Sequence, residues 1–104
     1  MSEKELLHQR IIEQLKKVFD PELPVNIYDL GLIYAIDIND EHYVQVTMTL
    51  TAPSCPAAQS LPVEVDQKIR EIPGVKDVNV MITWTPKWDK SRMSEVAALE
   101  LGFL

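Results

Sequence analysis

The stretch Val44-Gln45-Val46-Thr47-Met48-Thr49-Leu50 alternates between apolar and polar side chains. A period of two places alternate side chains on opposite faces of a β-strand. The pattern therefore predicts a strand over residues 43–50, with Val44, Val46, Met48 and Leu50 facing a core and Gln45, Thr47 and Thr49 facing outward. The β-rich run 32–39 comes before it, and the polar turn 39–42 joins the two as an antiparallel hairpin.

Helical spacing is found on both sides of this hairpin. Residues 2–19 place Leu7, Ile11, Leu15 and Val18 on one stripe, widened by Leu6, Ile12 and Phe19. Ser2 and Glu5 have the spacing of a capping box, and Asp20-Pro21 should end the helix. After Cys55, a second stripe consists of Ala58, Leu61, Val65 and Ile69. Pro62 interrupts it, so this helix either kinks or begins later than Pro56.

The C-terminal third predicts one more strand and one more helix. Residues 75–84 form a strand with Val78, Val80, Ile82 and Trp84 on one face, and residues 92–101 form a short helix closed by Gly102. The order α-β-β-α-β-α indicates a two-layer α+β domain, with helices covering one face of a small three-stranded mixed sheet. Strands 43–50 and 75–84 flank a crossover helix and are expected to be parallel. A length of 104 residues suits one domain, 1–104.

Composition excludes several classes of protein. Sixteen carboxylates against ten Lys and Arg give a net charge of −6, which opposes binding to nucleic acid. No apolar run approaches the length of a membrane span, and the N-terminus does not resemble a signal peptide. A single cysteine, Cys55, forms no internal disulfide. We therefore expect a cytoplasmic protein that binds neither membranes nor nucleic acid.

Cys55 lies between Pro53 and Pro56, at the predicted start of a helix. A lone cysteine is more often a small buried apolar residue, and spacing alone leaves the two interpretations about even. Catalysis by the thiol is disfavoured, because a helix N-terminus stabilises a thiolate by only about 0.3–1 kcal/mol and no Lys, Arg or His occurs between Leu50 and Asp66. Metal ligation is favoured, although a closed site needs further ligands from carboxylates, a second protomer, a small thiol or a client protein.

Residues 20–31 form a long loop rich in Pro, Asp, Asn and Gly. Loops of this length often carry function. For Asp20, Glu22 and Asp29, however, spacing alone favours turn chemistry and capping over a functional role.

Four sequence blocks, in this order, resemble the SufT-like and PaaD-like family of metal–sulfur cluster assembly factors, formerly a domain of unknown function. The blocks are Asp20-Pro21-Glu22, residues 26–32 (Asn-Ile-Tyr-Asp-Leu-Gly-Leu), Thr49-Leu50-Thr51 with Pro53-Ser54-Cys55-Pro56, and Gly74-Val75 before a Val-rich strand. The resemblance extends from about Ile11 to Gly102. It includes Trp84-Thr85-Pro86 and Trp88.

The resemblance implies an α+β fold and a non-enzymatic role in iron–sulfur protein maturation, as a carrier or a cluster-free adaptor working with the assembly machinery and apo-protein clients. It implies that Cys55 ligates a labile iron–sulfur cluster, with polar residues around it. Those residues are Asp20, Glu22, Asn26, Asp29, Thr49 and Thr51. Residues 1–104 contain neither the Cys-rich extension of PaaD-like members nor the Cys-x-x-Cys pair of NifU-type scaffolds, so we expect the general assembly branch of the family.

One thiolate per chain has a consequence for assembly. A cluster bridged by cysteines needs at least two chains, so we expect a weak homodimer whose population rises on cluster loading. Trp is enriched at interfaces, and Trp84 and Trp88 lie near the C-terminus. Core packing is the preferred interpretation for Trp84.

Overall fold

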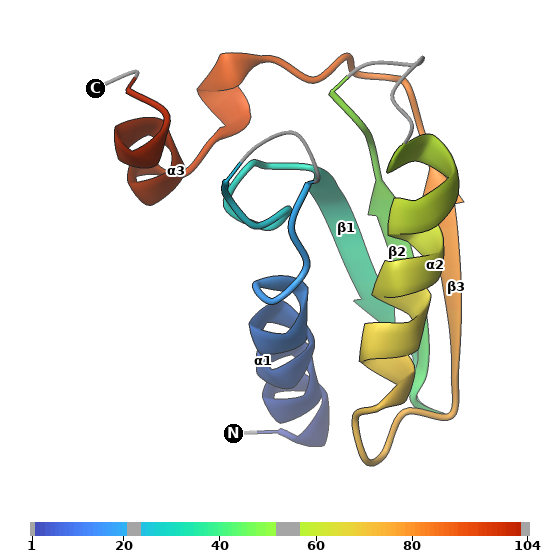
Figure 1. Ribbon diagram of the computed structural model, residues 1–104. Helices are drawn as coiled ribbons and strands as arrows, with labels where there is room; N and C mark the ends of the chain where they lie inside the picture. Colours follow the sequence, from blue (N-terminus) through green and yellow to red (C-terminus); the bar gives the residue numbers. More distant parts are fainter. Residues whose placement is uncertain (1, 21–23, 52–56, 103–104) are drawn as a thin grey trace.

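The computed structural model describes residues 2–20, 24–51 and 57–102 (Figure 1). Its elements are α1 (Glu3–Leu15), β1 (Ile33–Ile38), β2 (Tyr43–Met48), α2 (Ala57–Arg70), β3 (Asp77–Ile82) and α3 (Glu95–Glu100), with a 3-10 turn at Lys90–Arg92. The predicted order α-β-β-α-β-α and the α+β class are confirmed.

The sheet has the order β1-β2-β3, with β2 in the centre. β1 runs antiparallel to β2, and β3 runs parallel to it with Val44 opposite Val78. The predicted mixed sheet is confirmed, including the parallel pair. In β2, Val44, Val46 and Met48 are buried, whereas Gln45 is exposed.

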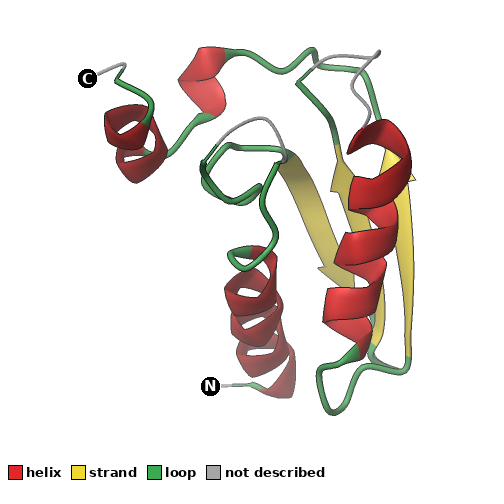
Figure 2. Cartoon of the chain, viewed as in Figure 1, coloured by secondary structure: helices red, strands yellow, loops and turns green. Residues whose placement is uncertain are grey.

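Two helices cover the buried side of the sheet. α1 packs against β1 and α2, and α2 packs against β3 (Figure 2). Leu61, Val65 and Ile69 of α2 are buried, as the spacing predicted, although Pro62 lies inside this helix. The core also contains residues of α1 and of the loop before β1: Leu7, Ile11, Leu15, Val18, Val25, Ile27, Leu30 and Leu32.

The first helix ends earlier than the sequence predicts. Ser2 caps it as expected, accepting a hydrogen bond from the N–H of Glu5 at 3.1 Å. The helix stops at Leu15 rather than at Asp20, because Val18 accepts a hydrogen bond from the N–H of Ile27 at 2.9 Å and Phe19 forms a β-bridge with Asn26. Phe19 is consequently 52% exposed instead of widening the apolar stripe; the same prediction fails for Leu6, which is 44% exposed.

Two predictions near the C-terminus are also wrong. β3 ends at Ile82, so Trp84 lies beyond the strand and is 45% exposed rather than facing the core. The last helix begins at Glu95, not at residue 92, because Ser94 is the N-cap and its hydroxyl accepts a hydrogen bond from the N–H of Ala97.

Arg70, the last residue of α2, is bonded to the start of β3. Its guanidinium pairs with Asp66 and with Asp77, the latter at 2.7 Å, and donates to the carbonyl of Val78 at 3.1 Å. The N–H of Val78 donates to the Asp77 carboxylate at 2.9 Å. These bonds, that of Val78 first and that of Arg70 second, lower the pKa of Asp77.

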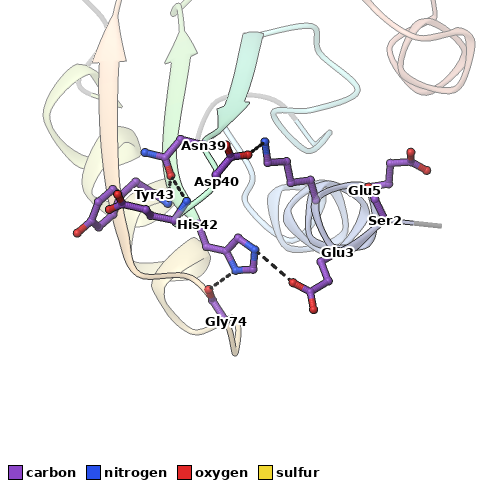
Figure 3. Close-up of polar contacts among 10 residues, drawn as sticks. Ser2, Glu3, Glu5, Asn39, Asp40, His42, Tyr43 and Gly74 are labelled. Carbon is purple, nitrogen blue, oxygen red and sulfur yellow. Dashed lines mark hydrogen bonds and ion pairs between the residues drawn. The ribbon is translucent and has the colours of Figure 1, made fainter.

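The N-terminus of α1 and the hairpin turn between β1 and β2 meet in a polar junction, shown in Figure 3. Asn39 accepts hydrogen bonds from the N–H groups of Glu41 and Tyr43 through its side-chain oxygen. His42 lies 3.2 Å from the carbonyl of Gly74 and 3.7 Å from the Glu3 carboxylate. The junction binds the hairpin turn to α1 and to the loop before β3.

None of the helices that the structure describes is long and apolar enough to span a bilayer.

Candidate functional site

The candidate site lies where the chain leaves β2, at the end of the sheet opposite the hairpin turn (Figure 1). Here the N–H of Thr49 donates to the carbonyl of Leu32, and the N–H of Thr83 donates to the carbonyl of Met48, both at 2.8 Å. The chain then continues through Thr51 into residues 52–56. Cys55 is among these residues, so its predicted role lies outside the described part of the chain.

Thr49 is buried, which contradicts the predicted outward direction. It is 1% exposed, and within the described ranges its hydroxyl has no hydrogen-bond partner. The alternation stops because β2 ends at Met48 and the backbone of Thr49 bonds to the loop before β1. Leu50 is buried as predicted, so three consecutive side chains, Met48, Thr49 and Leu50, are enclosed. Thr51 is half-buried.

Asp20 is also buried, at 3% exposure. It follows Phe19, whose bridge to Asn26 closes the base of the loop. The structure therefore places Asp20 and Asn26 on two chain segments that lie side by side. Glu22 falls outside the described residues.

Asn26 and Asp29 are bonded to each other. The Asn26 amide donates to the Asp29 carboxylate at 2.7 Å, and the Asn26 side-chain oxygen accepts from the N–H of Asp29 at 2.9 Å. The carbonyl of Asp29 also accepts the N–H of Ser94 at 2.8 Å. This is the turn chemistry that the spacing favoured, and it connects the loop to the C-terminal segment.

The C-terminal segment docks on the same loop, a feature that sequence reasoning missed. The indole N–H of Trp88 donates to the carbonyl of Leu30 at 2.7 Å, and the hydroxyl of Tyr34 donates to the carbonyl of Pro86 at 2.9 Å. Gly31 has φ +81°, and a Cβ there would lie 2.2 Å from the carbonyl oxygen of Arg92. Gly31, Pro86 and Trp88 all belong to the resembling segments, and glycine permits both that φ and that approach, but no pattern in the sequence indicated that these segments meet.

A hollow of about 680 Å³ opens beside the exit of β2. Thr51 lines it on one side and residues 87–91 line it on the other. Trp88 is half-buried there, whereas Lys87 and Lys90 are exposed. Across the ranges 2–20, 24–51 and 57–102, no three His, Asp or Glu side chains gather into a group that could hold a metal ion.

The fold and the site together define a small α+β domain in which a docked C-terminal segment and a loop before β1 surround the exit from the central strand. The profile of a family described as iron–sulfur cluster assembly proteins matches residues 8–82. The chain belongs to this family.

Individual relatives agree with that assignment. An Fe-S protein maturation auxiliary factor of Porphyromonas gingivalis is 53% identical over 94 residues, which cover 90% of each chain. The Fe-S protein maturation auxiliary factor SufT of Staphylococcus aureus is 41% identical over 85 residues, covering 82% of this chain and 97% of the relative. The crystal structure of a domain of unknown function, DUF59, from Bacillus anthracis has a TM-score of 0.89 at 34% identity and covers 96% of this chain and 95% of its own.

These findings confirm the SufT-like resemblance and the predicted class of function, assembly of iron–sulfur proteins. The related proteins are maturation factors by name. The ligand and positioning roles of individual residues remain predictions.

Proposed function

We propose that this protein carries iron–sulfur clusters to apo-proteins, that Cys55 is a transient ligand of the cluster, and that the protein is not an enzyme. Family membership is the observation that carries the proposal. A thiolate is the usual protein ligand of such clusters, and this chain has one cysteine. Incomplete ligation by one chain favours release of the cluster over storage.

The residues around Cys55 have different roles in this proposal. Thr49 and Thr51 position the cysteine loop, and the buried hydroxyl of Thr49 is available to a group outside the described residues. Asp20 and Glu22 are auxiliary ligands; the burial of Asp20 favours that role over contact with a client, since a client touches exposed groups. Asn26 and Asp29 hold the loop in shape through their mutual hydrogen bonds.

Anaerobic reconstitution with iron and sulfide tests the ligand role. Wild-type protein should gain the visible absorption of a cluster, and Cys55→Ser should not. Ser54→Ala is a matched control in the same loop and should load like wild type. If Cys55→Ser holds as much cluster as wild type, the ligand role is refuted.

The same variant separates a carrier from a cluster-free adaptor, which would only dock clients and other assembly factors. If the protein is an adaptor, wild type never binds cluster, yet Cys55→Ser still loses client maturation. A thiol enzyme is a less favoured alternative, tested by the pH dependence of Cys55 alkylation. The sequence places no cation beside Cys55, so an ordinary thiol is expected there. An unusually acidic thiol would therefore favour the thiol enzyme.

The proposal includes a weak homodimer formed around the cluster. Each chain supplies one Cys55 thiolate, and carboxylates or a small thiol complete the site. Exposure of Trp84 makes it available to such an interface. Sedimentation of wild type and Cys55→Ser, with and without cluster, measures the population of the dimer. Loading strictly as a monomer would rule out the bridged form. We place this activity in the cytoplasm, with the assembly machinery as partner.

A further inference from the structure

The segment that docks beside the exit of β2 is cationic in an acidic protein. Residues 84–92 contain Lys87, Lys90 and Arg92 against a single carboxylate, Asp89, whereas the whole chain has a net charge of −6. The Asp89 carboxylate accepts hydrogen bonds from the N–H and the hydroxyl of Ser91, so it is engaged within its own turn. Positive charge is therefore concentrated at one place on a negative surface.

This segment is also held in a fixed shape. Trp88 and Ser94 bond to the loop before β1, at 2.7 and 2.8 Å, and the Arg92 guanidinium lies 4.6 Å from the centre of the Tyr34 ring. Lys87 and Lys90 flank Trp88, and Lys87 makes no ion pair with any residue that the structure describes. A surface organised before binding loses less conformational entropy when a partner binds.

We propose that the hollow formed by Thr51 and residues 87–91 is a docking surface for an acidic segment of a partner protein. Lys87 and Lys90 pair with its carboxylates, and the exposed edge of Trp88 packs against its backbone. This inference deepens the proposed function, on which it rests for the partner's role as a client or assembly factor. Thr51 precedes Cys55 by four positions in the sequence, so a segment bound here contacts the chain shortly before the proposed ligand.

Charge complementarity favours a protein segment over other polyanions. A nucleic acid or an anionic membrane extends well beyond the hollow and would face the remaining negative surface. A short acidic segment meets only the local cations, and a hollow of about 680 Å³ is within the size range of binding pockets. Its binding should weaken as salt rises, because both lysines are exposed to solvent.

The test uses the full chain and a labelled short peptide of alternating glutamate and serine, followed by fluorescence anisotropy. Lys87→Gln with Lys90→Gln should weaken binding about three- to tenfold, corresponding to two exposed ion pairs. Arg10→Gln with Lys76→Gln removes the same charge from exposed positions on other elements and should weaken it less than twofold. A matched peptide of glutamine and serine should not bind. Equal weakening by both double variants would overturn the proposal.

Amide chemical shifts locate the bound peptide. Changes should centre on Thr51, residues 87–91 and the indole N–H of Trp88. Changes spread over other cations would refute this docking surface, and equal changes with inorganic phosphate or glutathione would identify a small-anion site instead. The lysine variants should still load cluster, and Cys55→Ser should still bind peptide. If wild type binds the peptide but does not load cluster, the carrier proposal alone is refuted. If wild type loads cluster but does not bind the peptide, the docking surface alone is refuted.

Discussion

Replacement of Gly31 by alanine should release the C-terminal segment from the loop before β1. The new Cβ would lie 2.2 Å from the carbonyl oxygen of Arg92 and 2.8 Å from the Arg92 Cβ, so the backbone there must move. The positive φ of Gly31 costs about 1–2 kcal/mol in an L-residue. Loss of the hydrogen bonds of Trp88 and Ser94 to this loop adds about 1 kcal/mol each. We therefore expect a destabilisation of about 3–4 kcal/mol.

Gly74→Ala is the matched control. Gly74 also has a positive φ, +99°, but no described atom lies within 4 Å of a Cβ there, so only the backbone cost of about 1–2 kcal/mol applies. Thermal denaturation, followed by far-UV circular dichroism and tryptophan fluorescence, measures both variants. For a chain of this length, the midpoint temperatures should differ by about 8 °C. If Gly31→Ala is no less stable than Gly74→Ala, the close approach to Arg92 does not hold the segment in place.

Three further predictions test the core, the site and the pH dependence. Met48→Ala should lower the free energy of unfolding in urea by about 2–5 kcal/mol, because this side chain is fully buried in the central strand; a loss below about 1 kcal/mol would contradict that packing. Thr49→Val should change the free energy of unfolding by less than about 1 kcal/mol, since no described residue bonds the hydroxyl, yet it should reduce retention of reconstituted cluster. A loss of more than about 2 kcal/mol in the free energy of unfolding would show a structural bond instead. Asp77→Asn should lower the melting temperature at neutral pH, and this effect should shrink as pH falls below the ordinary carboxylate range. The lowered pKa of Asp77 makes its ionised form stabilising, and that contribution is lost as pH falls through the folded-state pKa; a difference that persists undiminished in strong acid would refute this origin.

The sequence was sufficient for the elements whose periodicity agrees with their packing. Alternation in residues 44–48 predicted the buried side of β2, and the spacing of Leu61, Val65 and Ile69 predicted that of α2. Two of the failures occurred where hydrogen bonds between separate segments decide the structure. The helical pattern continues to Phe19, but the bridge to Asn26 draws this residue out of α1. Thr49 fits the alternation, yet its bond to Leu32 turns it inward.

The candidate site was only partly predictable for the same reason. Residue types and their order singled out Asn26 and Asp29, but the bonds between them are local turn chemistry. The docking of the C-terminal segment depends on Trp88 reaching a carbonyl 58 positions away in the chain, which no local pattern encodes. Long-range contacts of this kind determine the surroundings of the exit from β2, and a single sequence does not display them.

The position of Arg70 bears on how the protein behaves at high concentration. β3 is an outer strand of the sheet, and such strands are templates for pairing with another molecule. Arg70 occupies the carbonyl of Val78, and the Asp77 carboxylate occupies its N–H, so at this position a foreign strand finds both main-chain groups already bonded. A second chain cannot extend the sheet over the full length of β3 without breaking these bonds. The charged pair thus opposes edge-to-edge aggregation during synthesis and storage, a benefit separate from its contribution to folding stability.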